Sequence, residues 1–114
     1  MLRVILAVIA LLWAIPAAAQ GCAEIKFARG AVSGDVSGRV GDGAPMCFTF
    51  GSGSGQTARL QLFGSDNTCF TVAGVIDCQA DYSFVTRRQT YRVDVFQLMR
   101  SAGTERFTLR LTIR

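Results

Sequence analysis

Strict alternation of apolar and polar residues near the end of the chain constrains its fold more than any other feature. In residues 105–114, Phe107, Leu109 and Leu111 alternate with polar residues, and residues 90–99 alternate in the same way. A period of two is typical of a β-strand with one dry face and one wet face. We therefore predict a long β-hairpin joined by residues 100–104. Because an isolated hairpin is marginally stable, its apolar face requires a second layer from the rest of the chain.

The remaining strand patterns are shorter and are separated by turn residues. They lie at residues 24–27, 32–40, 46–50, 58–62, 69–72, 75–78 and 82–85. Turn signals recur about every 8–12 positions, and no helical periodicity follows residue 20. This pattern predicts an all-β fold, an antiparallel β-sandwich of about seven to nine short strands, with a small closed barrel as the alternative. The glycines of residues 32–40 place that strand at an edge or a bulge.

The first 19 residues have the organisation of a secretory signal peptide. Arg3 precedes a short apolar run, and residues 16–19 end in small residues. The run is shorter than the roughly 20 residues of a spanning helix, which favours cleavage after Ala19 over a membrane anchor. A lipoprotein with Cys22 as acceptor is a weaker alternative, because no large aliphatic residue stands three positions earlier. Residues 20–114 are then a single periplasmic or secreted domain with no membrane span.

Export makes the four cysteines candidates for two disulfides that staple the fold. Three pairings are possible. A two-residue turn at residues 73–74 would place Cys69 opposite Cys78 at a non-hydrogen-bonded pair, where side chains approach most closely. Cys22–Cys47 then follows by elimination. Because turn registers slip, the other pairings stay open.

The residue types argue against catalysis. The chain has no histidine, so it holds no Ser-His or Cys-His pair, and the cysteines lack the C-x-x-C spacing of a zinc site. Its acidic residues form no recognisable acid–base motif. Residues 51–55, Gly-Ser-Gly-Ser-Gly, lack the central serine of a nucleophile elbow and the following helix of a phosphate loop, and predict a flexible surface loop. We expect a protein that is not an enzyme and has no cofactor or metal.

The charge is modest and is carried by arginine. The formal net charge is +4, and Lys26 is the only lysine. Such a charge, spread along an exported chain, argues against nucleic acid as a partner. Arginine presents a planar fork of N–H donors that suits carboxylates and other anions. The other interpretation of these arginines is ordinary solvated strand faces.

Three stretches together resemble a known family. They are residues 27–31 leading into 36–40, residues 55–60, and residues 91–95 continuing through Met99 and Arg100 to residues 107–109. This combination resembles the bacterial pre-peptidase C-terminal (PPC) type of β-sandwich. Within that group it is most similar to the periplasmic inhibitors of g-type (goose-type) lysozyme, over nearly the whole mature chain.

The resemblance implies inhibition without catalysis. A loop at one end of the sandwich would enter the acidic substrate cleft of the lysozyme, with arginines beside the last hairpin and an aromatic residue as partner contacts. Arg100 matches the leading arginine. Thr104 occupies the position of the second, with Arg106 near but displaced. The aromatic position falls at Phe48, where the family typically has tyrosine, and Arg88 is a further candidate contact.

Other interpretations of these residues remain. Arg100 could be a solvated turn residue or pair with Glu105 or Asp94, and Phe48 could belong to the core. The expected function is binding and inhibition of a cell-wall hydrolase of the g-type lysozyme kind by an inserted loop arginine. The alternative is a non-inhibitory PPC-type envelope binding or accessory module for glycan or protein.

Overall fold

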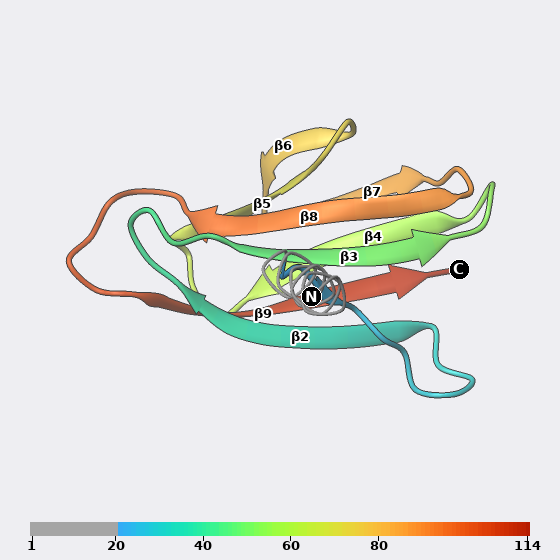
Figure 1. Cartoon of the computed structure of the whole chain (residues 1–114), viewed down its shortest axis with the longest axis horizontal. Coiled ribbons are helices and arrows are strands. Elements are labelled where there is room, and N and C mark those ends of the chain that lie inside the picture. Colours follow the sequence, from blue (N-terminus) through green and yellow to red (C-terminus); the bar gives the residue numbers. More distant parts are fainter. Residues whose placement is uncertain (1–20) are drawn as a thin grey trace, which may run out of the picture.

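The computed structural model describes residues 21–114, which form nine strands (Figure 1). The predicted signal peptide at residues 1–19 lies outside the described residues. The strands are β1 (Ala23–Glu24), β2 (Ser33–Val40), β3 (Met46–Ser52), β4 (Thr57–Phe63), β5 (Thr68–Val72), β6 (Ile76–Gln79), β7 (Asp81–Val85), β8 (Gln89–Gln97) and β9 (Glu105–Ile113). Within this part of the chain no helix is long and apolar enough to cross a membrane.

The strands form two packed sheets. The five-stranded sheet has the order β1-β3-β8-β5-β6, and the four-stranded sheet has the order β2-β9-β4-β7. Every pair is antiparallel except β1 with β3, which is parallel. The predicted all-β sandwich is confirmed, and the sheets do not close into a barrel. The strand at residues 32–40 is indeed an edge, because β2 pairs only with β9.

The predicted hairpin of the last two strands is wrong. β8 lies in the five-stranded sheet and β9 in the four-stranded sheet, so residues 98–104 cross from one sheet to the other. We call this connection the arch; it closes the left end of the molecule in Figure 1. Alternation identifies the dry face of a strand but not its neighbour. The dry faces of β8 and β9 both point into the core, and seven residues easily bridge sheets that stack about 10 Å apart.

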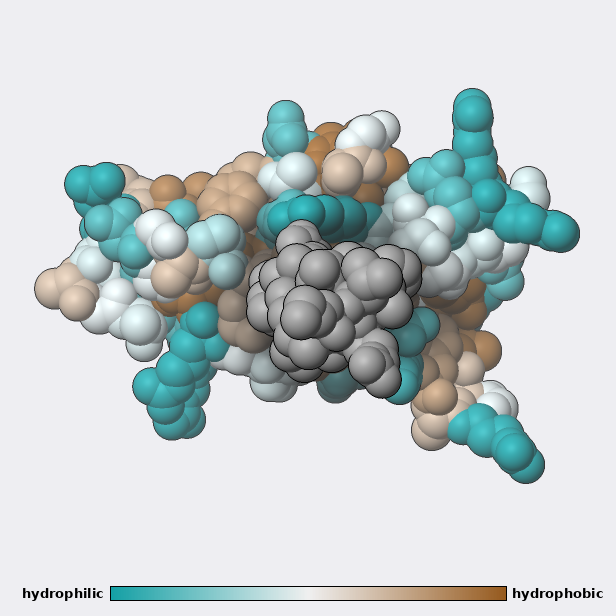
Figure 2. Space-filling view, viewed as in Figure 1, coloured by the Kyte–Doolittle hydropathy of each residue, from teal (hydrophilic) through white to brown (hydrophobic). Residues whose placement is uncertain are grey.

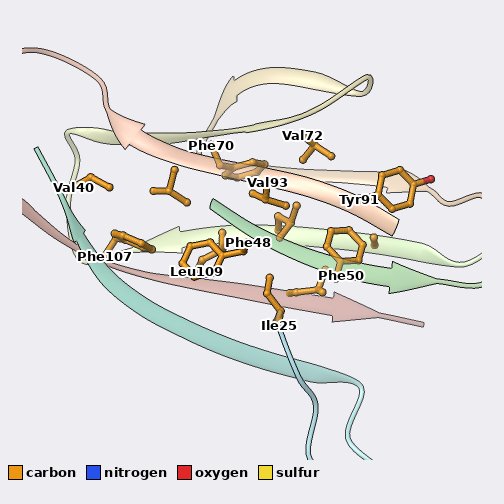
Figure 3. Packing of buried hydrophobic residues seen from close by; sticks show 14 residues of the cluster. Ile25, Val40, Phe48, Phe50, Phe70, Val72, Tyr91, Val93, Phe107 and Leu109 are labelled. Carbon is orange, nitrogen blue, oxygen red and sulfur yellow. The ribbon is translucent and has the colours of Figure 1, made fainter. Parts of the chain in front are cut away.

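The core lies between the sheets and is rich in aromatic rings (Figure 3). Phe50 stacks on Tyr91 with ring centroids 5.3 Å apart, and Phe48 meets Phe107 edge-on at 6.1 Å. β2 has two glycines on its inward side, Gly34 and Gly38. The side chains of Phe27 and Met46 occupy the space beside them. A Cβ at Gly38 would meet the thioether end of the Met46 side chain, which would have to move to make room for it.

The predicted disulfides are both present, Cys22–Cys47 and Cys69–Cys78. The register predicted for the second is wrong, because Val72 pairs with Ile76 rather than Val75. β6 carries an extra residue opposite β5, and Cys78 has a positive φ of 39°. A β-bulge re-aims the side chains that follow it, which lets the bridge form despite the altered register.

Candidate functional site

The arch is fastened to the turn that precedes β5. Leu98 N donates to the carbonyl oxygen of Asn67 at 2.9 Å. The Asn67 side chain continues this pairing, since Oδ1 accepts from Met99 N at 2.8 Å and Nδ2 donates to Met99 O at 2.9 Å. One asparagine thus satisfies both backbone groups of Met99, which fixes the conformation of the arch at that residue.

Asn67 is itself held in position by hydrogen bonds with Ser65 and Glu105. Ser65 Oγ donates to Glu105 Oε1 at 2.9 Å and accepts from Asn67 N at 2.9 Å. Asn67 Nδ2 also donates to Glu105 Oε2 at 3.1 Å. These hydrogen bonds, first from Asn67 and then from Ser65, hold the pKa of Glu105 below its ordinary value. The cluster ties the start of β9 to the turn before β5.

Gln97 fastens the far half of the arch. Its Nε2 donates to Ser101 Oγ at 2.9 Å and to Gly103 O at 3.3 Å. Its buried Oε1 has no hydrogen-bond partner within residues 21–114. With the contacts from Asn67, the arch is therefore held at residues 98, 99, 101 and 103. Arg100 is the position between these attachments.

The attachments leave three side chains pointing outward at this end. Leu98 is 51% exposed, Met99 is 70% exposed, and the Arg100 side chain is 83% exposed. Two large apolar side chains thus lie exposed beside a cation, on a backbone that is held by hydrogen bonds. We call Leu98, Met99 and Arg100 the arch tip.

Arg100 has one acidic neighbour, Asp42, in the turn between β2 and β3. Its Nε lies 3.1 Å from Asp42 Oδ1, whereas Arg59 and Arg110 each make two hydrogen bonds to an aspartate. The partner is thus neither Asp94 nor Glu105. An exposed pair of this kind contributes about 0–1 kcal/mol, so Arg100 can leave Asp42 at little cost.

A shallow hollow separates the arch from the turn that carries Asp42. Its volume is about 340 Å³, and its lining includes Pro45, Phe96, Leu98 and Arg100. The turn packs directly on the arch, since a Cβ at Gly41 would lie 3.2 Å from Cγ2 of Thr104. The arch and residues 41–45 therefore form one continuous surface at this end of the sandwich.

The other predicted contact residues are dispersed. Arg106 is exposed on the outer face of the four-stranded sheet, near the arch end. Arg88 follows β7 and lies at the opposite end of the sandwich. Figure 2 shows hydrophilic side chains projecting from both ends of the long axis. Phe48 is only 2% exposed, in the core against Phe107, so the interpretation of Phe48 as a core residue is the one that the packing favours.

The Gly-Ser loop lies at the end opposite the arch and is held in place rather than free. Thr86 is buried, and its Oγ1 donates to Gly53 O at 2.6 Å and accepts from Gln56 N at 3.2 Å. Gln56 Oε1 in turn accepts from Gly53 N at 2.8 Å. The predicted surface position of the loop is confirmed, and hydrogen bonds to Thr86 and Gln56 hold its backbone at Gly53 and Gly55.

The sequence did not single out Asn67 or Asp42 as site residues. Both occur in stretches that the sequence identifies only as turns. The partner of Asn67 is Met99, 32 residues later, and the partner of Asp42 is Arg100, on another loop. Asparagine and aspartate are common in turns for local reasons, so only the assembled fold distinguishes these two. Within residues 21–114, no group of three potential metal ligands comes together.

These features define a class of protein. Two packed sheets in this order, with an ordered arch at one end, define a small β-sandwich. No family model and no curated protein matches the chain in sequence.

Solved structures identify the particular sandwich that this chain resembles. Aeromonas hydrophila PliG, a periplasmic lysozyme inhibitor of g-type lysozyme, is 22% identical with a TM-score of 0.70, over 82% of this chain and 96% of that one. Salmonella Typhimurium PliG is 15% identical with a TM-score of 0.67, over 83% and 100%. The pre-peptidase C-terminal domain of a Bacillus anthracis collagenase is 12% identical with a TM-score of 0.56, over 82% and 95%. The expected PPC-type fold is confirmed.

Proposed function

We propose that this protein is an exported inhibitor of a g-type lysozyme, or of a similar cell-wall hydrolase, that binds through the arch tip. The observation that carries the proposal is the attached arch, which holds Leu98, Met99 and Arg100 exposed at one end of a PPC-type sandwich. The structural likeness to periplasmic inhibitors of g-type lysozyme supports the same function. The signal-peptide pattern and two disulfides support action in the periplasm.

The chemistry of the partner favours an arginine at the centre of the contact. Glycoside hydrolases carry a pair of carboxylates in the substrate cleft. In that cleft, Arg100 would exchange its exposed contact with Asp42 for a desolvated carboxylate, which accepts two parallel N–H bonds from the guanidinium. Such buried, charge-assisted bonds contribute more than the exposed pair that is lost, so the exchange favours binding.

Leu98 and Met99, beside Arg100, would add buried apolar area around the ion pair in the complex. Burying Met99 and the exposed part of Leu98 would each contribute on the order of 1–2 kcal/mol and exclude water from the ion pair. No bond of the partner is made or broken in this mechanism. The inhibitor acts by filling the cleft, and Arg88, at the other end, lies outside the contact.

Inhibition of g-type lysozyme by the purified protein is the direct test, measured as the clearing rate of a cell-wall suspension. We expect inhibition at micromolar excess and a loss of about 30-fold or more in affinity for Arg100→Ala. Arg88→Ala is the matched control and should inhibit like the unaltered protein. Full lysozyme activity in the presence of the unaltered protein would rule the proposal out.

The second candidate is a non-inhibitory envelope module for glycan or protein. Its specific support is the likeness to the pre-peptidase C-terminal domain of a collagenase. Retention of the protein on insoluble peptidoglycan, together with unchanged lysozyme activity, is the result expected for that function. The reverse result, inhibition without retention, favours the inhibitor.

A further inference from the structure

Two arginines face each other on the outer surface of the four-stranded sheet. Arg39 of β2 and Arg106 of β9 are direct partners in the antiparallel register. Their neighbours Val40 and Phe107 are buried, so the alternation of each strand turns both arginines away from the core. Directly opposed residues have Cβ atoms about 4.5–5.5 Å apart, which brings the two side chains side by side.

No acidic group neutralises this pair. The ion pairs within residues 21–114 involve Arg59, Arg92, Arg100 and Arg110 but neither Arg39 nor Arg106. The nearest carboxylate along the chain, Glu105, is occupied by Asn67 and Ser65. Like charges directly opposite each other destabilise a sheet, so the unbound protein carries a cost at this position.

The surface beside the pair is hollowed and polar. A shallow depression of about 570 Å³ is lined by both arginines together with Ser37, Gly64 and Thr108. Ser37 Oγ and Thr108 Oγ1 form a hydrogen bond of 3.0 Å with each other. One of the two hydroxyls donates this bond, and the hydrogen of the other is left to donate to a ligand. Gly64 has a φ of 101°, and a Cβ there would lie 3.2 Å from the backbone oxygen of Arg106, so its lack of a side chain lets the chain after β4 approach Arg106 closely.

We propose that Arg39 and Arg106 form a binding site for a phosphate-class oxyanion. The two guanidinium forks present only donors, the hydroxyl can add one more, and each fork can bind two oxygens of the same group. A carboxylate has only two oxygens, which is enough for one guanidinium fork. A phosphate has enough oxygens to bind both forks, and its negative charge removes the repulsion between the two arginines. Arg100 is not part of this site, so the inference does not rest on the proposed inhibition.

A titration of the purified protein with inorganic phosphate, at constant ionic strength, tests the site. We expect saturable shifts of the backbone amide signals of residues 37–39 and 106–108. Arg39→Gln and Arg106→Gln should each weaken binding by about ten-fold or more. Arg59→Gln is the matched control, because Arg59 lies on the same face but is paired with Asp81. Equal weakening by Arg59→Gln, or equal shifts with acetate, would overturn the proposal.

A second arm identifies the source of the phosphate. Co-sedimentation with phosphatidylglycerol vesicles, against phosphatidylcholine vesicles, reports binding to phosphate groups on a lipid surface. Binding in either arm that is lost in Arg39→Gln and Arg106→Gln but kept in Arg59→Gln supports the site and names its source. Binding in neither arm overturns it.

Thermal unfolding provides a readout that needs no bound ligand. At low salt and without phosphate, Arg39→Gln should raise the melting temperature by about 2–4 °C, because one of two repelling charges is removed. Phosphate should raise the melting temperature of the unaltered protein more than that of Arg39→Gln. A lower melting temperature for Arg39→Gln without phosphate would show that the pair is not repulsive and contradict the proposal.

Discussion

The side-chain amide of Asn67 holds the peptide backbone of Met99 at both of its polar groups, at 2.8 and 2.9 Å. This relationship connects a turn at one edge of the core to the exposed tip 32 residues later in the chain. In the proposed complex, a tip held in this way would lose little conformational freedom on entering the cleft of the enzyme. Such preorganisation raises affinity by lowering the entropic cost of binding.

Asn67→Ala should destabilise the protein and weaken inhibition together. It removes the two hydrogen bonds to Met99 and one to Glu105, and we expect a loss of about 1–3 kcal/mol in the free energy of unfolding. Urea unfolding measures that loss, and hydrogen exchange of the Met99 amide should accelerate. Asp66→Ala, an exposed neighbour, is the control and should change stability by less than about 0.5 kcal/mol. Unchanged exchange at Met99 would show that Asn67 does not order the arch.

Asp42→Asn should strengthen inhibition slightly. Arg100 then no longer has to leave an ion pair, and exposed pairs contribute about 0.2–1 kcal/mol, which corresponds to a gain of roughly 1.5- to 5-fold in affinity. Inhibition titrations at low salt measure this gain, which should shrink at high salt because the pair is screened. A large loss of inhibition would mean that Asp42 itself contacts the enzyme.

Glu105 should make stability depend on pH. Because hydrogen bonds from Asn67 and Ser65 lower its pKa in the folded state, its carboxylate stabilises the fold above the ordinary pKa near 4.5. This contribution is lost as the pH falls through the lowered pKa. Melting temperatures of Glu105→Gln should lie below those of the unaltered protein at pH 7 and converge with them in acid. Glu24→Gln removes an exposed carboxylate of β1 and is the control, which should melt like the unaltered protein at pH 7.

Phe48→Tyr should weaken the fold without improving inhibition. The ring is 2% exposed and packs against Phe107, so a tyrosine hydroxyl would be buried with no partner prepared for it. We expect a loss of about 1–3 kcal/mol in the free energy of unfolding, measured by urea titration. Tighter lysozyme binding by this variant would instead show that the hydroxyl reaches the partner and that Phe48 belongs to the contact surface.

Removal of the Cys22–Cys47 bridge should reduce stability more than removal of Cys69–Cys78. The bridges close loops of 25 and 9 residues, which correspond to about 3.5 and 2.6 kcal/mol in the chain-entropy model. Double Cys→Ser variants of each bridge, compared by urea unfolding, measure the order. A larger loss for the shorter loop would indicate that contacts within the folded state, rather than loop entropy, dominate.

The sequence predicted the architecture better than the connections. Alternation in residues such as Val93 and Leu109 determines which face of a strand is dry, and the packed core confirms it. It contains no information on whether two successive strands are neighbours or face each other, and here they face each other. The pairing of Cys69 with Cys78 was predicted from a regular turn, whereas the bulge at Cys78 depends on a backbone conformation that sequence patterns do not report.

The site was predictable only in part. Arg100 was identified through its resemblance to a family position, and the structure places it at an exposed tip. Asn67, Gln97 and Asp42, which shape its surroundings, come from three other segments. The contacts of Asn67 and Asp42 join segments far apart in the sequence, which no local pattern encodes, whereas Gln97 contacts residues only four and six positions later.

The position of β9 has a consequence for how the chain acquires its structure during synthesis. β9 lies between β2 and β4, and β2 pairs with no other strand. The four-stranded sheet therefore cannot assemble until β9 has been made. Before then, β2 has no hydrogen-bonding neighbour at all. Folding is therefore expected to wait for residues 105–113 and to be slow, since its decisive contacts join distant parts of the chain. In a nascent chain that stops before β9, we expect β2 and the free side of β4 to be open to proteases.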